Sequence, residues 1–168
     1  MEPIIFYGQN REDLILAAFF HDTSTGVYID VGAHHPVQDS VTKYFYEKGW
    51  TGLNIEPQEK QFKELTKDRK RDINLQMGMS DKPGELTLRS YKSDGLSTFS
   101  KSIKLTYENE GSVEYTNEYS DITVAVDTLE NVLSKHKVGS IQFMKVDVEG
   151  FEFEVLNGNN WKKYRPEV

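Results

Sequence analysis

The stretch "VYIDVGAHHPVQDS", residues 27–40, decides how this chain is interpreted. Its mostly apolar start predicts a buried strand, yet the strand contains Asp30 and is followed directly by Gly32. A glycine at this point lets the backbone approach a ligand closely and suggests a nucleotide. The two histidines that follow, His34 and His35, suggest a metal instead. Adjacent side chains in an extended segment point apart, so a packing role within the loop is favoured over metal binding.

Strand and helix signals alternate around this stretch. The predicted strands are residues 26–31, 51–56 and 73–79, and the predicted helices between them are residues 39–49 and 57–68. Gly49 is a stop signal for the first of these helices, and Pro57 is tolerated at the start of the second. Strands that alternate with helices indicate a mostly parallel sheet with covering helices, so we expect an α/β protein with a doubly wound sheet.

The remaining elements follow the same signals with one long interruption. The pattern predicts a helix at 11–20 capped by Asn10, strands at 84–91, 122–126 and 141–146, a helix at 127–136 capped by Asp127, and a helix at 149–158 ended by Gly158. The apolar face expected for the first helix consists of Leu14, Ile15, Ala18 and Phe19. Residues 92–120 are polar, and we expect a long excursion with little regular structure that serves acceptor recognition.

We interpret the chain as one domain over residues 1–168. Its expected parts are a helical lead-in at 1–22, a first half with a hairpin strand at 27–91, the polar excursion at 92–120, and an incomplete second half at 121–168. The closing residues "RPEV" stand where a further strand would begin, so we expect the sheet to stop before its last strands.

Composition excludes several classes of protein. The net charge of −7 and the pI of about 5.1 argue against binding nucleic acid by neutralising phosphates. The basic run "KDRKRD", residues 67–72, is interleaved with acids and is interpreted as a solvated helix end. The chain has no cysteine, and its apolar runs fall short of the about 18 residues of a membrane span. We therefore expect a soluble cytoplasmic protein, and the sequence leaves its oligomeric state open.

The glycine loop favours a nucleoside cofactor without phosphates. Glu56 follows the second strand 24 positions after Gly32, and an acid about 20 positions after such a glycine is placed to accept from both ribose hydroxyls. A dinucleotide site requires three glycines in the pattern G-x-G-x-x-G, whereas this loop reads G-A-H-H-P-V. A nicotinamide-dependent dehydrogenase is therefore disfavoured, and S-adenosylmethionine is the expected cofactor.

Several linked motifs resemble the FkbM family of S-adenosylmethionine-dependent methyltransferases. They are "YIDVGAHHPVQDSVTKYFYEKGWTGLNIEP", "INLQMGMSDKPGELTL", "GLSTF", "VDTLENVL" and "FMKVDVEGFEFEVLNG", in the order found in that family. The resemblance implies the class I methyltransferase fold, which is Rossmann-like, and O-methylation of a hydroxyl on a sugar, glycan or glycosylated natural product. One departure is His34, because the family commonly has asparagine there.

The resemblance also implies roles for individual residues. Asp30, Gly32, Ala33 and His34 would shape the loop around the amino-acid part of the cofactor, and Glu56 would hold the ribose. The other cofactor contacts would come from Met79 and Ser80 along the adenine and from Asp147 near the transferred methyl group, with Glu149 and Gly150 beside it and Gln9 and Glu12 closing the site.

Asp147 and Glu149 are the expected catalytic residues, because a hydroxyl acceptor benefits from a base that takes its proton. His34 is a further candidate for that base. The two acids could also hold Mg²⁺ or cap the helix that follows, and metal binding is the less favoured of these alternatives. The leading hypothesis is an O-methyltransferase. The alternative is a non-catalytic cofactor-binding or interaction domain of a larger glycan-modifying protein.

Overall fold

The computed structural model of the chain describes residues 4–92, 94–109, 116 and 118–168. These residues form two compact units, each built from several segments of the chain. The first comprises Met1–Gln76, Gly139–Lys145 and Pro166–Val168, and the second comprises Met77–Val138 and Val146–Arg165. No helix among the described residues is both long enough and apolar enough to cross a membrane.

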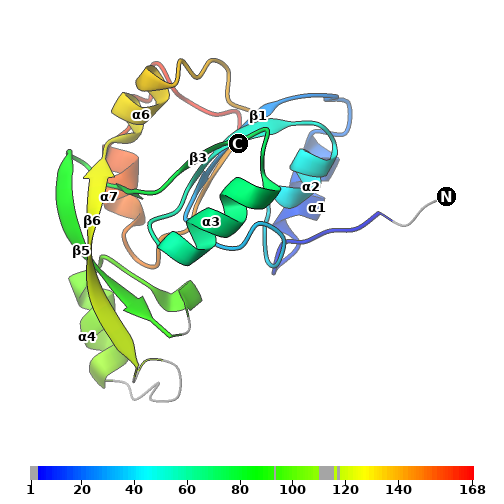
Figure 1. Cartoon of the computed structure of the whole chain (residues 1–168). Helices are drawn as coiled ribbons and strands as arrows, with labels where there is room; N and C mark the ends of the chain where they lie inside the picture. Colours follow the sequence, from blue (N-terminus) through cyan, green and yellow to red (C-terminus); the bar gives the residue numbers. More distant parts are fainter. Residues whose placement is uncertain (1–3, 93, 110–115, 117) are drawn as a thin grey trace. The chain divides into compact units, whose positions relative to one another are not determined.

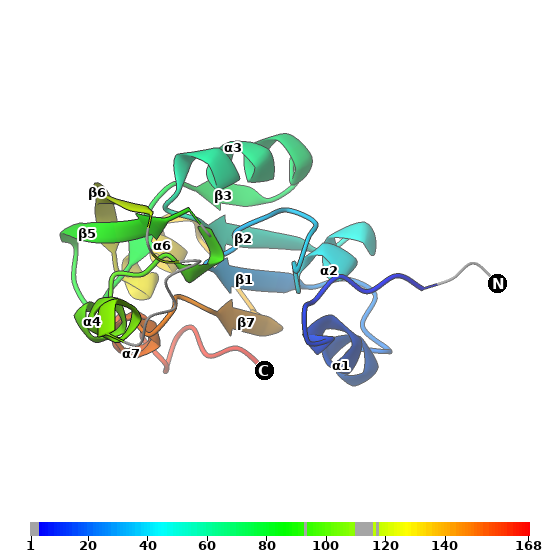
Figure 2. The ribbon, with the colours of Figure 1, turned by 90° about the horizontal axis from the view of Figure 1, so that it is seen from below.

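The first unit is built on a four-stranded sheet in the order β3-β2-β1-β7 (Figure 2). Its elements in chain order are α1 Glu12–Phe19, β1 Val27–Val31, α2 Lys43–Glu47, β2 Thr51–Ile55, α3 Glu59–Asp68, β3 Ile73–Leu75 and β7 Phe143–Val146. Strand β1 pairs in parallel with β2, and β2 pairs in parallel with β3. The chain moves outward from β1 to β3 and later returns as β7 on the other side of β1. Strand order therefore reverses at β1, where doubly wound sheets bind their ligands.

Aromatic side chains form the core of this unit. The buried cluster consists of Phe20, Tyr28, Phe45, Tyr46, Trp50 and Phe143. Most of their ring pairs meet edge-on or tilted, as for Phe45 and Phe143, whose centroids lie 4.8 Å apart, whereas Tyr28 stacks on Phe143 at 5.7 Å. Gly49, with φ of 90°, ends the turn after α2, which confirms the predicted stop signal.

The second unit carries a smaller sheet in the order β4-β6-β5, whose two long strands form an antiparallel ribbon (Figure 1). Its elements in chain order are β4 Gly78–Met79, β5 Gly84–Tyr91, the 3₁₀ helix η1 Asp94–Leu96, α4 Lys101–Asn109, β6 Tyr119–Asp127, α6 Leu129–Lys135 and α7 Glu152–Asn157. Gly158 follows α7, and a Cβ atom there would lie 2.2 Å from the carbonyl oxygen of Ser80. This close approach, rather than a left-handed turn, requires glycine at the position predicted as a helix end.

The predicted strand over residues 73–79 is wrong as a single element. It is divided into β3, which pairs with β2, and β4, which pairs with β6 in the other sheet. A continuous strand-like run predicts extended backbone and carries no information on the partner strand. The prediction therefore identified the conformation but missed the change of sheet.

The polar excursion is also more regular than the sequence predicts. Residues 101–109 form α4, a helix of nine residues. Its described side chains include none that is buried, and Ile103 and Tyr107 are half-buried one helical turn apart. One such pair is too little to produce a visible apolar period, so the helix escaped prediction.

Two predicted helix caps and one helix face are wrong. Arg11 rather than Asn10 precedes α1, and Thr128 rather than Asp127 caps α6 by accepting from the N–H of Asn131. The expected apolar face of α1 is exposed, with Ile15 at 69% and Phe19 at 61% of their full accessibility.

The opposite side of α1 packs inward because of Asp13. Its buried carboxylate accepts hydrogen bonds from the N–H groups of Tyr7 and Gly8. Leu16 and Ala17 lie on the packed side and contact the aromatic cluster. The hydrogen bonds of Asp13 to the backbone of the preceding segment thus decide which side of α1 is buried, against the apolar pattern of the helix.

Substitution of Gly52 by alanine should destabilise the fold. The added Cβ would lie 1.9 Å from the ring of Tyr28, whose hydroxyl is held in place by Asp72. We expect Gly52→Ala to lower the free energy of unfolding by about 1–3 kcal/mol, measured by urea denaturation. Gly139→Ala is the control, because nothing lies within 4 Å of its added Cβ. Equal stability of the two variants would contradict the packing argument.

Candidate functional site

The loop after β1 is shaped by left-handed backbone at two positions. Gly32 has φ of 75° and His34 has φ of 50°. The N–H groups of Gly32 and Ala33 donate to the carbonyl oxygen of Ile55, at 3.0 and 3.1 Å. A left-handed conformation is unfavourable for a residue with a Cβ, so His34 must be held there by its surroundings. The loop is therefore fastened to the carboxyl end of β2.

Glu56 provides part of this fastening. It directly follows β2, and its side chain is almost fully buried, with 3% of its surface exposed. One carboxylate oxygen accepts from the N–H of His34 at 2.9 Å, and the other accepts from the N–H of Gln58 at 2.9 Å. Burial raises the pKa of Glu56, and these two hydrogen bonds oppose that rise. The acid identified from its spacing thus lies directly against the predicted cofactor loop.

Asp30 is engaged inside the protein through both carboxylate oxygens. One oxygen accepts from the hydroxyl of Thr42 at 2.8 Å, and the other lies 3.3 Å from the ammonium nitrogen of Lys145. Lys145 also donates to the carbonyl oxygen of Gly32. Asp30 therefore supports the loop through its neighbours, and it is 2% exposed.

Lys145 was not selected from the sequence. It lies on β7, next to the end of β1, and connects two predicted cofactor residues, Asp30 and Gly32. Its sequence signal is a lysine within the otherwise apolar run "FMKV". A cation inside a buried strand needs an anionic partner, and that requirement could have identified it.

The lead-in segment contributes Glu12, whose pKa is affected by the charge of Lys145. Burial raises the pKa of Glu12, but hydrogen bonds from backbone N–H groups and from the side chain of Asn10, together with the charge of Lys145, bring it below its ordinary value. Gln9 is exposed, and its role in closing the site stays a prediction. The charge of Lys145 thus reaches Glu12, and the role of Glu12 in closing the site stays a prediction.

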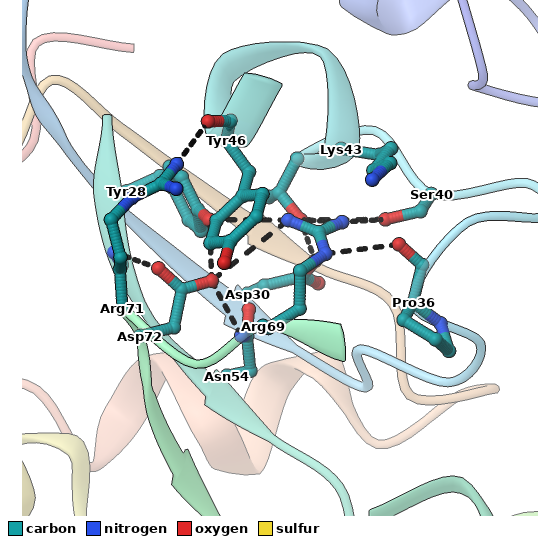
Figure 3. Close-up of polar contacts among 12 residues, drawn as sticks. Tyr28, Asp30, Pro36, Ser40, Lys43, Tyr46, Asn54, Arg69, Arg71 and Asp72 are labelled. Carbon is teal, nitrogen blue, oxygen red and sulfur yellow. Dashed lines mark hydrogen bonds and ion pairs between the residues drawn. The ribbon is translucent and has the colours of Figure 1, made fainter. Parts of the chain in front are cut away.

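A buried polar cluster lies beneath the loop (Figure 3). Arg69, at its centre, has no exposed surface, and Asp72 is 9% exposed. The interpretation of residues 67–72 as a solvated helix end is therefore wrong for these two residues. Charge runs are usually solvated, and nothing local distinguishes the members of this run that turn inward.

Asp72 anchors the cluster to the sheet. It accepts from the hydroxyl of Tyr28 at 2.6 Å, from the N–H of Gly52 and from the side chain of Asn54. The ion pair with Arg69 is long, at 3.8 Å, and burial raises the pKa of Asp72 despite that charge and those hydrogen bonds. Burial and the charge of Asp72 also raise the pKa of Tyr28. The Tyr28 hydroxyl therefore stays protonated and donates a hydrogen bond to Asp72.

His35 packs within the loop, in agreement with its sequence interpretation. Its Nδ1 accepts from the N–H groups of Val37 and Gln38, at 3.1 and 2.8 Å. Within the described part of the chain, no group of three or more histidine, cysteine, aspartate or glutamate side chains is arranged to hold a metal ion.

In the second unit, Met79 and Ser80 lie at the end of β4 and are buried. The N–H of Ser80 donates to the carbonyl oxygen of Asp127 at 2.9 Å, which continues the pairing of β4 with β6. The side chain of Asp127 accepts from the N–H of Thr128 and from the side chain of Asn131. Asp127 therefore supports the start of α6 from one position before the actual cap.

The turn after β7 carries the expected catalytic acids. Asp147 is exposed, and Glu149 adopts a left-handed conformation with φ of 53°. The hydroxyl of Thr98 donates to the carbonyl oxygen of Glu149 at 2.6 Å. Glu152, which was not selected from the sequence, accepts from the N–H groups of Val148 and Gly150. The turn is thus held on both sides.

Helix α4 packs against the same turn. Gly150 has φ of 85°, and a Cβ atom there would lie 2.4 Å from the side chain of Ile103. Burial, followed by the charge of Glu149, raises the pKa of Tyr107. The segment expected to recognise the acceptor therefore supports the loop that carries Glu149.

Comparison with protein families matches the Methyltransferase FkbM domain over residues 30–168. The chain belongs to the FkbM methyltransferase family. The match confirms the resemblance found in the motifs, and the mostly parallel sheet of the first unit agrees with the Rossmann-like fold expected for the family. Neither the curated proteins nor the solved structures gave a match.

In this FkbM family member, loss of Lys145 should destabilise the first unit. Lys145→Met would leave the buried carboxylate of Asp30 without its cation, and we expect a loss of about 3–5 kcal/mol in the free energy of unfolding. Lys63→Met is the matched control, because Lys63 pairs with Glu59 at the surface and should cost less than about 1 kcal/mol. The combination of Asp30→Asn with Lys145→Met should cost less than the sum of the single changes. Simple additivity would show that the pair is not coupled.

The contribution of Glu56 to stability should fall as pH rises. The pKa of Glu56 is raised in the folded protein, so with rising pH its carboxyl group loses the proton in the unfolded chain before it does so in the folded protein. Above the pKa of the unfolded chain, folding therefore becomes less favourable. We expect the difference in unfolding free energy between the wild type and Glu56→Ala to shift against the wild type as the pH rises above about 4, the ordinary pKa of a glutamate. Urea denaturation of both proteins at several pH values measures this difference. A difference that shifts in favour of the wild type would contradict the raised pKa.

Proposed function

We propose that this methyltransferase uses S-adenosylmethionine and methylates a hydroxyl group, with a sugar or glycan as the acceptor. The observation that carries the proposal is the position of Glu56. Its buried carboxylate follows β2 and is hydrogen-bonded to the loop that follows β1. Two neighbouring parallel strands thus present a glycine turn and an acid at the same edge of the sheet.

The chemistry of Glu56 fits a nucleoside. Each of its oxygens accepts from one backbone N–H, and a carboxylate oxygen has the capacity for a second donor. The two hydroxyls of a ribose are donors with the spacing of one carboxylate. Gly32 contributes a backbone without a Cβ, which permits close approach of a ligand to the loop.

The residues around the loop would hold and orient the cofactor. Asp30 and Lys145 fix the carbonyl group of Gly32, and Glu56 fixes the N–H of His34. When bound, S-adenosylmethionine would supply a methyl group carried on a sulfonium sulfur. The acceptor oxygen would attack the methyl carbon in line with its bond to sulfur, and S-adenosylhomocysteine would leave. Positioning accounts for much of the rate of such a displacement.

In this proposal the acceptor hydroxyl loses its proton to a carboxylate. Asp147 and Glu149 are our candidates for that base, and the held turn around Glu149 supports the second of them. Tyrosine side chains near α4 support a sugar acceptor, because their faces stack against sugar rings. Tyr119 is 50% exposed and Tyr107 is half-buried, and both contact the buried Tyr91 edge-on, with centroids 5.8 and 5.6 Å from its ring.

Titration calorimetry with S-adenosylhomocysteine tests the cofactor part of the proposal. We expect the intact chain to bind, and Glu56→Ala to weaken binding by about tenfold to a hundredfold through loss of a charged acceptor. Glu59→Ala, an exposed acid three positions further on, should bind as the wild type does. Absence of binding by the wild type, or equal affinity in Glu56→Ala, would contradict the proposal. An NADH titration, expected to show no binding, separates this cofactor from a nicotinamide.

A further inference from the structure

Arg69 is a fully buried cation whose guanidinium group donates its hydrogen bonds to neutral oxygens, while the carboxylate of Asp72 lies 3.8 Å away. Its Nε donates to the carbonyl oxygen of Pro36 at 2.9 Å, and one Nη donates to the hydroxyl of Tyr28 at 3.2 Å. The other Nη donates to the hydroxyls of Ser40 at 2.8 Å and Thr42 at 3.5 Å. Removing a guanidinium group from water costs free energy. A buried arginine therefore points to a structural role for the directions in which its N–H groups donate.

The partners of Arg69 come from two parts of the first unit. Tyr28 and Asp72 belong to the sheet and to the segment that leads into β3. Pro36, Ser40 and Thr42 all belong to the segment between β1 and α2, downstream of Gly32. Figure 3 shows Pro36 and Ser40 beside Arg69. A planar fork with donors in fixed directions can join these two parts rigidly, which a single ammonium group cannot do.

The joined segment contains backbone that requires support. Asp39, like His34, has a positive φ, of 57°, although neither is glycine. Left-handed backbone at such residues costs free energy and persists where surrounding contacts impose it. Arg69 contacts the segment on both sides of Asp39, through Pro36 and Ser40.

The connection continues from Arg69 to the glycine turn. Thr42 accepts from Arg69 and donates to Asp30, so one hydroxyl serves both neighbours. Asp30 pairs with Lys145, which donates to the carbonyl oxygen of Gly32. Four successive polar contacts thus lead from Arg69, through Thr42, Asp30 and Lys145, to Gly32.

We propose that Arg69 is a positioning residue for the cofactor loop, acting through Thr42, Asp30 and Lys145 to hold Gly32 in its binding conformation. This inference rests on the proposed cofactor site and adds a determinant of affinity that lies beneath the loop. A loop that is already held in its binding conformation loses little conformational entropy when the cofactor binds, which favours affinity.

The test compares the affinity of variants for S-adenosylhomocysteine by calorimetry, at a temperature where circular dichroism shows each to be fully folded. Arg69→Lys keeps the charge but loses the fork, and we expect its dissociation constant to rise by about tenfold. Thr42→Val removes the bridging hydroxyl and should weaken binding by several-fold, whereas Thr42→Ser keeps the hydroxyl and should bind as the wild type does. Leu65→Ala, in the buried face of α3, is the control for loss of stability alone and should retain wild-type affinity.

The outcomes separate the inference from the function on which it rests. If the wild type binds, Glu56→Ala binds more weakly, and Arg69→Lys and Thr42→Val bind as the wild type does, the positioning role is wrong and the cofactor site stands. If Leu65→Ala weakens binding as much as Arg69→Lys, the effect is one of stability and the inference is also overturned. If the wild type itself does not bind, the proposed cofactor site fails and this inference fails with it. Should Arg69→Lys not fold, the difference between Thr42→Val and Thr42→Ser decides.

Discussion

The first unit depends on one constraint, which is that the loop after β1 must keep a backbone conformation that its residues do not favour. Gly32 adopts it freely, but His34 does not. The surrounding contacts act on this loop from different directions, because Glu56 holds it from β2 and Lys145 holds it from β7. The reversal of strand order at β1 is what brings these two side chains to one loop.

The second unit solves a similar problem with different groups. Glu149 and Gly150 are consecutive residues with positive φ, and the turn they form is held by the hydroxyl of Thr98 and the carboxylate of Glu152. Ile103 leaves no space for a Cβ at Gly150. In both units distant side chains help to shape a turn, Glu56 and Lys145 in the first and Thr98 and Ile103 in the second, so its geometry is not only a local property.

Acids at or next to the carboxyl ends of strands look alike in the sequence and differ in the structure. Glu56 faces the cofactor loop, Asp30 is neutralised by Lys145, and Asp127 supports a helix start. The difference lies in which donors surround each carboxylate: the two donors to Asp30 are remote in the sequence, Glu56 has one remote donor and one local donor, and both donors to Asp127 are local. Spacing from a glycine turn identified Glu56 because a nucleoside has a fixed length. No comparable rule distinguishes Asp30 from Asp147, whose role stays a prediction.

The sequence by itself determined the α/β class, the strands β1, β2 and β5 and the family, because these follow from local periodicity and from linked motifs. It failed at the division between β3 and β4, at helix α4 and at the buried side of α1. Only the tertiary structure decided these, together with the buried state of Arg69 and the role of Lys145. The physical reason is that burial and pairing depend on partners far along the chain, which a local pattern does not specify.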